Sequence, residues 1–395
     1  MISFDEAVAI IRSAAHPLGA ETVTLDRAAG RVLAAPVVAG IDSPRADVSA
    51  MDGYAVRDAD LRDFPVALIV RGESVPGSGC DGPVEPGSCV RIFTGAPLPR
   101  GADRIVIQEQ VRREGDRAII DAPPGTAAWV RAQGSDFQAG DELLAPGRLL
   151  DAGALIAAAG ADAAELEVHA RPRLALLSTG DELVEPGAAR ALPLAIPDSV
   201  SFGVAALAEQ WGAQLVHKAR LTDQLSSMEA AAREAATGAD VVVVTGGASV
   251  GERDFAKAMF APLGLDLLFS TVAMRPGKPA WFGHIGDVLV IGLPGNPTSA
   301  LVTARLLLAP LLARIGGRPM EQSLRWEPAR LGAPLPACDS RETFHRARLS
   351  AGEATPLDFQ QSHAQKALAE ADVLVRQAAS APAIAAGEQA DVLRL

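Results

Sequence analysis

The sequence predicts a multidomain α/β protein built around a doubly wound parallel sheet, with smaller β-rich units before and after it. Between about residues 171 and 318, apolar runs such as "LALLS" and "DVVVV" alternate with helical stretches. Apolar strands that do not alternate with polar residues, separated by helices, indicate a parallel sheet covered on both faces. By contrast, residues 45–138 and the end of the chain show only short strand-like runs. These observations define the fold class.

The composition is that of folded domains and disfavours some functions. A length of 395 residues exceeds one ordinary core and suggests roughly two to four domains. The net charge of -12 argues against non-specific nucleic-acid binding. Three cysteines without CxxC spacing predict a reduced compartment. No signal peptide is expected from the acidic N-terminus, and the apolar run near residue 305 is interrupted by Arg305, Pro310 and Arg314. We therefore expect a cytoplasmic protein without a membrane span.

The N-terminal part of the chain predicts a segmented domain with an insertion. A helix begins after Ser3, which forms a capping box with Glu6, and an extended segment follows it. An alanine-rich helix that Asp151 caps is expected to return and pack on this first helix. The predicted boundaries are 1–44 and 139–170 for the segmented N-terminal linker domain and 45–138 for the inserted β-rich domain.

The α/β domain is predicted over 171–318 and a small β domain over 319–395. Glycines 212, 238 and 316 follow the helical stretches and are expected to end them. The predicted strands of the sheet are 174–178, 214–221, 240–244 and 288–293. After "GGRP", the runs "SLRWEPARLG", "TFHRARLS" and "ADVLVRQ" indicate strands of the terminal domain.

Three strands of the predicted sheet end in glycine-bearing loops, "STGDEL", "TGGASVG" and "GLPGNP". Ligands of open α/β sheets bind at the carboxyl ends of the strands. Glycines let backbone N–H groups approach a ligand, and helix N-termini add partial positive charge. The predicted ligand-contacting residues of these loops are Thr179, Gly180, Thr245, Gly246, Gly247, Ser249, Gly251, Pro294 and Asn296.

Acidic residues follow these glycines directly, Asp181 and Glu182 in one loop and Asp254 in another. A bare phosphate would be repelled by them. They indicate either a Mg²⁺ ion that shares ligand oxygens or a donor-rich ring edge such as that of a pterin or guanine. The alternative is that the aspartates cap the following helices. Asp223 likewise is either the N-cap of its helix or part of the site.

Other chemistry-bearing residues lie in turns. Arg275 and Lys278 flank a Pro–Gly turn suited to phosphate or another oxyanion, unless the turn is simply solvated. In the β-rich unit, Asp52, Thr94 and Asp136 lie in glycine-containing turns, which are ordinary loop chemistry when taken singly. No Ser/His/Asp or Cys/His arrangement indicates a protein nucleophile.

Taken together, seven stretches resemble the molybdopterin molybdenumtransferase family, which includes the bacterial MoeA proteins and the gephyrin E domain. They are, in the family's order, "SAMDGYA", "FTGAPLPRGAD", "GSDF", "STGDEL", "TGGASVGERDF", "RPGKP" and "GLPGNPTSAL". The resemblance implies a homodimer whose α/β domain binds molybdopterin and whose C-terminal domain is a small β-barrel. It also implies that adenylated molybdopterin is cleaved in the presence of molybdate and magnesium, with release of AMP.

The resemblance also assigns roles to residues. Family active sites lie between the α/β domain of one subunit and the β insertion of the other. This implies catalytic roles for Asp52, Thr94, Asp136, Glu182, Asp223 and Asp254, with Glu182 and Asp254 organising metal or pterin contacts. Molybdopterin adenylyltransferase and molybdoenzyme acceptors are the implied partners, with no nucleic acid and no membrane.

Several positions depart from the family's pattern. Thr271 and Arg275 stand where the family often has lysine, and Val200 stands where asparagine is usual. His363 and Ala364 replace small residues of a C-terminal turn. These departures leave open a non-catalytic molybdopterin-binding or scaffold homologue. A nucleotide hydrolase that shares only the sheet domain is disfavoured by the β insertion.

Overall fold

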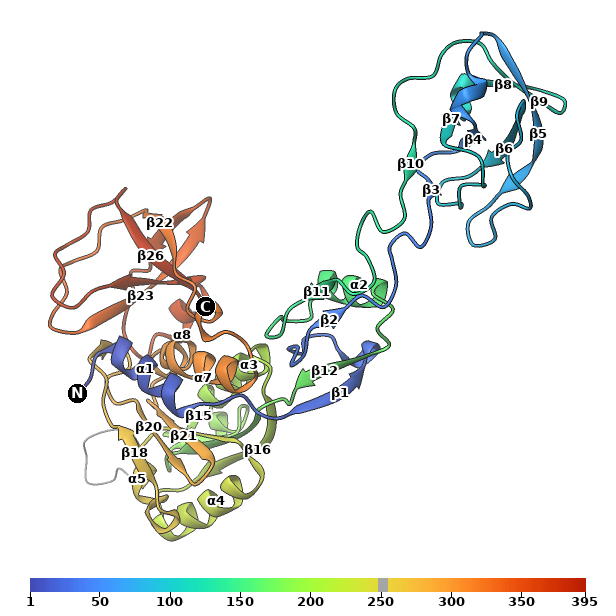
Figure 1. Cartoon of the computed structure of the whole chain (residues 1–395). Coiled ribbons are helices and arrows are strands. Elements are labelled where there is room, and N and C mark those ends of the chain that lie inside the picture. Colours follow the sequence, from blue (N-terminus) through green and yellow to red (C-terminus); the bar gives the residue numbers. More distant parts are fainter. Residues whose placement is uncertain (248–254) are drawn as a thin grey trace.

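The computed structural model describes residues 1–247 and 255–395. The molecule is elongated, with the α/β unit and the C-terminal β unit at one end and the inserted β-rich unit at the other (Figure 1). Two extended stretches of chain join the inserted unit to the rest. The predicted site residues Ser249, Gly251 and Asp254 lie outside the described residues.

The predicted doubly wound sheet is confirmed. Its order is β16-β13-β17-β21-β20-β18. The apolar strand β17 is buried along its whole length, as the sequence indicated. Val204 of α3 packs in the core on one face of the sheet, and Met228 of α4 packs in the core on the other. The four parallel strands and these helices are β13 (Arg173–Thr179), β16 (Gln214–Leu221), β17 (Val241–Thr245), β21 (Val288–Leu293), α3 (Val200–Gln210) and α4 (Leu225–Gly238).

The sequence analysis missed two strands at one edge of this sheet. β20 (Trp281–Ile285) and β18 (Asp266–Phe269) continue it in antiparallel pairing. β20 follows the "RPGKP" turn closely, and half of the residues of β18 are exposed, so neither has the pattern of a fully buried strand. The smaller elements of this unit are β14 (Leu183–Val184), β15 (Ile196–Pro197), β19 (Met274–Arg275) and α5 (Phe255–Ala258).

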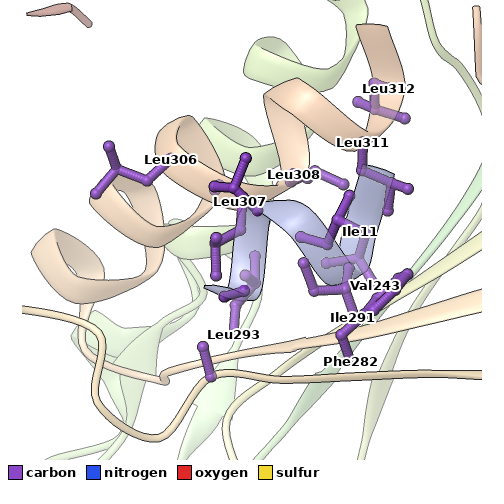
Figure 2. Close-up of a cluster of buried hydrophobic side chains, with 14 of the residues drawn as sticks. Ile11, Val243, Phe282, Ile291, Leu293, Leu306, Leu307, Leu308, Leu311 and Leu312 are labelled. Atoms are coloured by element: carbon purple, nitrogen blue, oxygen red, sulfur yellow. The ribbon is translucent and has the colours of Figure 1, made fainter. Parts of the chain in front are cut away.

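One long helical segment, Pro297–Ile315, forms the centre of the core. It consists of α6 (Pro297–Thr303), a π-helical turn (Ala304–Leu308) and α7 (Ala309–Ile315). Among the described residues it is the one helix long and apolar enough to cross a membrane, but 89% of the window is buried inside the protein. The interruptions at Arg305, Pro310 and Arg314 therefore do not keep the segment below membrane-spanning length, but its burial identifies it as a core helix. Its leucines pack against Ile11, Val243 and Ile291 (Figure 2).

The first helix, α1 (Phe4–Ala14), belongs to this same core. The predicted capping box between Ser3 and Glu6 is present. The helix buries its apolar face, including Phe4 and Ile11, against α7 and the sheet. The prediction that α2 (Ala152–Gly160) packs on α1 was wrong. Large apolar side chains fill the leucine-rich surface of α7 better than a flat alanine face does, and α2 packs instead against β11.

Antiparallel pairs connect the two segments that flank the insertion. They are β1 (Ala20–Thr24) with β12 (Glu165–His169), β2 (Val37–Val38) with β11 (Glu142–Leu144), and β3 (Val48–Ser49) with β10 (Val130–Arg131). As predicted, Asp151 caps α2 and accepts from the backbone N–H of Ala154. The insertion is a sheet of order β7-β4-β6-β5-β9-β8, formed by Gly53–Val56 (β4), Val66–Ser74 (β5), Ser88–Ile92 (β6), Arg104–Ile107 (β7), Val111–Glu114 (β8) and Arg117–Ile120 (β9).

The C-terminal unit is a closed five-stranded barrel, as expected. β23 pairs with both β24 and β25, which closes the sheet β23-β24-β22-β26-β25 on itself. The short strand β19 of the α/β unit also pairs with β23, so the turn that carries Arg275 is joined to the barrel. Its elements are β22 (Glu327–Leu331), β23 (Glu342–Ser350), β24 (Glu353–Pro356), β25 (Val373–Gln377), β26 (Gln389–Arg394) and α8 (Gln365–Ala369).

Candidate functional site

A cleft of about 750 Å³ lies at the carboxyl ends of β13, β17 and β21. This is the edge at which open α/β sheets bind ligands. The cleft gathers most of the residues that the glycine-bearing loops predicted. They are Thr179, Gly180, Glu182, Asp223, Thr245, Gly246, Gly247, Lys278, Pro294 and Asn296.

The glycines of these loops let the loops pack backbone to backbone. Gly246 has φ +88°, and a Cβ there would lie 2.5 Å from the carbonyl oxygen of Thr179. A Cβ on Gly295 would in turn lie 3.2 Å from the Cα of Gly246. The Gly246 N–H donates to the carbonyl of Leu293 at 3.2 Å. Any side chain at 246 would therefore push the loops apart and reshape the floor of the cleft.

The acids of the cleft come from different loops. Glu182 is exposed and lines the cleft, and its carboxylate folds against Gly180. Asp181 accepts a hydrogen bond from the Asp223 backbone N–H at 2.9 Å, which ties two loops together. The N-cap position of α4 is occupied by Gln224, so the N-cap alternative for Asp223 was wrong. The suggested role of Asp223 in the site stays a prediction.

The cleft also contains residues that the sequence analysis missed. Asp198 is only 2% exposed. Its Oδ1 accepts from the Ser201 N–H at 3.2 Å, and its Oδ2 has no hydrogen-bond partner among the described residues. Lys257 lines the cleft as well. The signal that would have found it is the scarcity of lysine, since two of the chain's four lysines, Lys257 and Lys278, lie here.

The positions that depart from the expected pattern lie in the same place. Val200, Thr271 and His363 all line the cleft. His363 reaches it because the preceding Ser362 is held at the N-terminus of α6, where its hydroxyl accepts from the Asn296 side-chain amide at 3.2 Å. The C-terminal barrel unit therefore forms one wall of the cleft.

A second pocket, of about 770 Å³, adjoins the cleft under the barrel and shares Lys278 and His363 with it. Arg275 lines this pocket and not the cleft. Asp339 at its edge receives a side-chain hydrogen bond from Arg341 that lowers the pKa of the carboxyl. The other basic residues lining the pocket are Arg341, His345 and Arg346. We refer to it below as the basic pocket.

Burial in the basic pocket opposes positive charge. Arg346 is 1% exposed, and burial lowers its pKa to about 10. Its guanidinium donates to the backbone carbonyl of Phe359 at 3.1 Å, and no carboxylate pairs with it among the described residues. Burial also lowers the pKa of His345. Uncompensated buried guanidinium charge is stabilised by a bound anion.

The predicted residues of the insertion form a separate cluster. Asp52 Oδ1 accepts from both the backbone N–H and the hydroxyl of Thr94, at 2.7 and 2.8 Å. These bonds, the backbone one first, lower the pKa of Asp52. Asp136 is exposed in the linking segment. None of the three lines the cleft of its own chain, and the insertion stands well away from that cleft (Figure 1).

Comparisons with known proteins agree on one family across the chain. Three family models match: the MoeA N-terminal region (domain I and II) at residues 2–161, the probable molybdopterin binding domain at 175–314, and the MoeA C-terminal region (domain IV) at 328–395. A molybdopterin molybdenumtransferase from Nostoc sp. is 38% identical over 78% of this chain and 71% of its own length. One from Synechococcus elongatus is 33% identical over the full length of both.

Solved structures give the same result. A molybdopterin biosynthesis MoeA protein from Pyrococcus horikoshii superposes with a TM-score of 0.83 at 29% identity, over 100% of this chain and 99% of that one. Sequence, fold and the order of the domains therefore coincide. The chain belongs to the molybdopterin molybdenumtransferase family, a family of transferases that act in molybdenum cofactor biosynthesis.

Proposed function

We propose that this chain inserts molybdate into adenylated molybdopterin and releases AMP in a magnesium-dependent reaction. The observation that carries the proposal is the pairing of two adjacent pockets that share Lys278. One is a glycine-walled cleft with carboxylates and lysines, and the other is rich in arginine. The glycine loops and carboxylates of the first suit a pterin nucleotide, and the arginines of the second suit an oxyanion.

The cleft offers contacts for both ends of the nucleotide substrate. Gly180 and Gly246 carry no side chain that would keep a phosphate away from the loops, and Lys257 and Lys278 supply positive charge. The buried carboxylate of Asp198 suits the donor edge of a pterin ring. Molybdate, as substrate, would lie in the basic pocket near Arg275 and Arg346.

Magnesium fits the donor set as an ion shared with the substrate. Within the described residues, no group of three or more His, Cys, Asp or Glu side chains is placed to hold a metal alone. Mg²⁺ commonly takes only one or two carboxylates together with substrate phosphates and water. Glu182 and Asp223 are the described residues that would hold it, with Asp254 as the further predicted ligand. Bound there, it would neutralise charge on the phosphoanhydride.

We further propose that the enzyme works as a homodimer with shared sites. The Asp52–Thr94 cluster has an ionised carboxylate and a hydroxyl but lies outside the cleft of its own chain. A partner subunit's insertion would bring an equivalent cluster to the cleft. The enzyme would receive its substrate from a molybdopterin adenylyltransferase and deliver its product to molybdoenzymes. Free cysteines at 80, 89 and 338 suit a cytoplasmic location.

The test is release of AMP from adenylated molybdopterin with Mg²⁺, with and without molybdate. Molybdate-dependent AMP is the expected result. Because Val200, Thr271 and His363 alter the cleft itself, a non-catalytic molybdopterin-binding homologue is the second candidate. Tight binding of the nucleotide without AMP release would favour that candidate. Absence of both binding and release would refute the proposed substrate.

A further inference from the structure

A small third pocket lies on another part of the molecule, at the joint between the segmented unit and the α/β unit. Its volume is about 210 Å³. Ala170, Arg171 and Pro172 line it and connect β12 to β13, so the pocket lies where the chain passes from one unit to the other. Its other walls come from the N-terminal segment at Arg31 and from the turn at Arg318.

Positive charge dominates the lining of this pocket, which includes Arg31, Arg171 and Arg318. Arg31 is 8% exposed and is already paired, because its guanidinium donates to Glu21 and to the carbonyl of His169. Neither Arg171 nor Arg318 has a carboxylate partner among the described residues. Glu209, which is exposed, is the one acid in the described lining.

Arg318 lines this space and packs on Trp211, which also lines it. Its guanidinium stacks over the ring of Trp211, with 4.6 Å from Cζ to the ring centroid. Its Nε is buried and has no hydrogen-bond partner among the described residues. Burial lowers the pKa of Arg318, so the charged form is under-compensated in the protein as it stands. The adjacent Gly317, with φ +79°, packs over the His169 ring, where a Cβ would lie 2.0 Å from Cδ2, which fixes the turn.

We propose that this pocket binds a small tetrahedral oxyanion of the phosphate or sulfate class. Its 210 Å³ corresponds to about seven water molecules at ~30 Å³ each. That space accommodates one inorganic oxyanion and lies below the roughly 300–1,000 Å³ typical of pockets for larger organic ligands such as nucleotides. The anion pairs with Arg171 and Arg318 and bridges the two units, so it stabilises the joint between them. This site is separate from the cleft and from the basic pocket.

The test is calorimetric titration of sodium phosphate into the full-length protein at constant ionic strength, with chloride as the reference anion. Tryptophan fluorescence is followed in the same titration. The difference between the wild-type and W211F signals gives the contribution of Trp211, which lines the pocket. We expect one saturable phosphate per chain at this site. R318Q should weaken it about tenfold or more, since a charge-assisted contact is lost. R171Q, at an exposed position without a partner, should weaken it comparably without affecting folding.

Two variants separate this site from other sources of binding. R325Q removes an arginine whose side chain is 79% exposed elsewhere and should leave the affinity unchanged. K278A alters both the cleft and the basic pocket and should also leave this phosphate bound. Phosphate should raise the Tm of the wild type by more than that of R171Q. The proposal is overturned if phosphate produces no saturable change in the Trp211 fluorescence of the wild type, if that change survives both R171Q and R318Q, or if K278A alone abolishes it.

Discussion

Two inactive variants should restore activity to each other if the active site is shared between subunits. Asp52 lies in the insertion and Glu182 in the cleft, and nothing in one chain brings them together. D52A and E182A should each be folded and inactive as homodimers. A mixed dimer has one site with both lesions and one site with neither. Activity should therefore return when the two variants are combined.

The size of the recovery follows from the symmetry. Random pairing of equal amounts of two chains gives about one half mixed dimers, and each mixed dimer has one intact site of two. The expected activity is thus about a quarter of the wild-type value per chain in the unfractionated mixture, and about half of it for mixed dimers purified away from both homodimers. If the site were formed within one chain, every site in the mixture would carry one lesion, and the expected recovery would be nil.

The assay is AMP release after co-expression of D52A and E182A with different affinity tags, followed by purification through both tags. The matched control combines D52A with D52N, whose lesions lie at the same position in the cluster. Each site of that mixed dimer keeps one lesion, so it should stay inactive. The shared-site model fails if the first pair shows no recovery or if the control pair recovers equally. Wild-type activity in either homodimer would remove that carboxylate from the mechanism.

Three further predictions follow from individual contacts. G246A forces a Cβ into a left-handed residue, at a cost of about 1–2 kcal/mol, and against the Thr179 carbonyl. We expect the loops to separate and kcat/KM for AMP release to fall by about tenfold or more. T94V removes one donor to Asp52, so the pKa of Asp52 should rise toward its ordinary value. As the pH falls, Asp52 is then protonated at a higher pH than in the wild type. The acidic limb of the pH–rate profile should therefore shift to higher pH. R305M leaves two buried backbone carbonyls unpaired and should lower the free energy of unfolding by about 2–5 kcal/mol in urea titrations; an unchanged midpoint would contradict this.

Local patterns in the sequence predicted the sheet and its ligand edge. Three of the parallel strands, β13, β17 and β21, show because burial on both faces makes them largely apolar. The edge strand β16 is instead partly exposed and contains polar residues. The glycine-bearing loops after β13, β17 and β21 meet at one edge because parallel strands place their carboxyl ends together. Topology alone therefore brings Thr179, Gly246 and Asn296 into one cleft.

Contacts between distant segments could not be predicted in this way. The sequence of α1 shows that the helix has an apolar face, but not which segment that face packs against. The packing depends on which surface of the folded chain offers large apolar side chains. Asp198 shows the same limit. The sequence has it in an ordinary Pro–Asp–Ser turn, and only the fold buries its carboxylate beside the cleft. The edge strand β18 was hidden because half of its residues are exposed.

The effect expected of each position that departs from the family's pattern depends on which pocket the residue lines. Thr271, where lysine is common, lines the cleft and not the basic pocket, whereas Arg275 lines the basic pocket and keeps its charge there. The positive charge absent at position 271 is therefore absent from the cleft, where we propose that the nucleotide binds. Lys257 and Lys278 remain there. The basic pocket, where we propose that the oxyanion binds, keeps its arginines. The departures should therefore weaken the hold on adenylated molybdopterin more than the hold on molybdate, because the Coulombic attraction lost at 271 acts over the cleft.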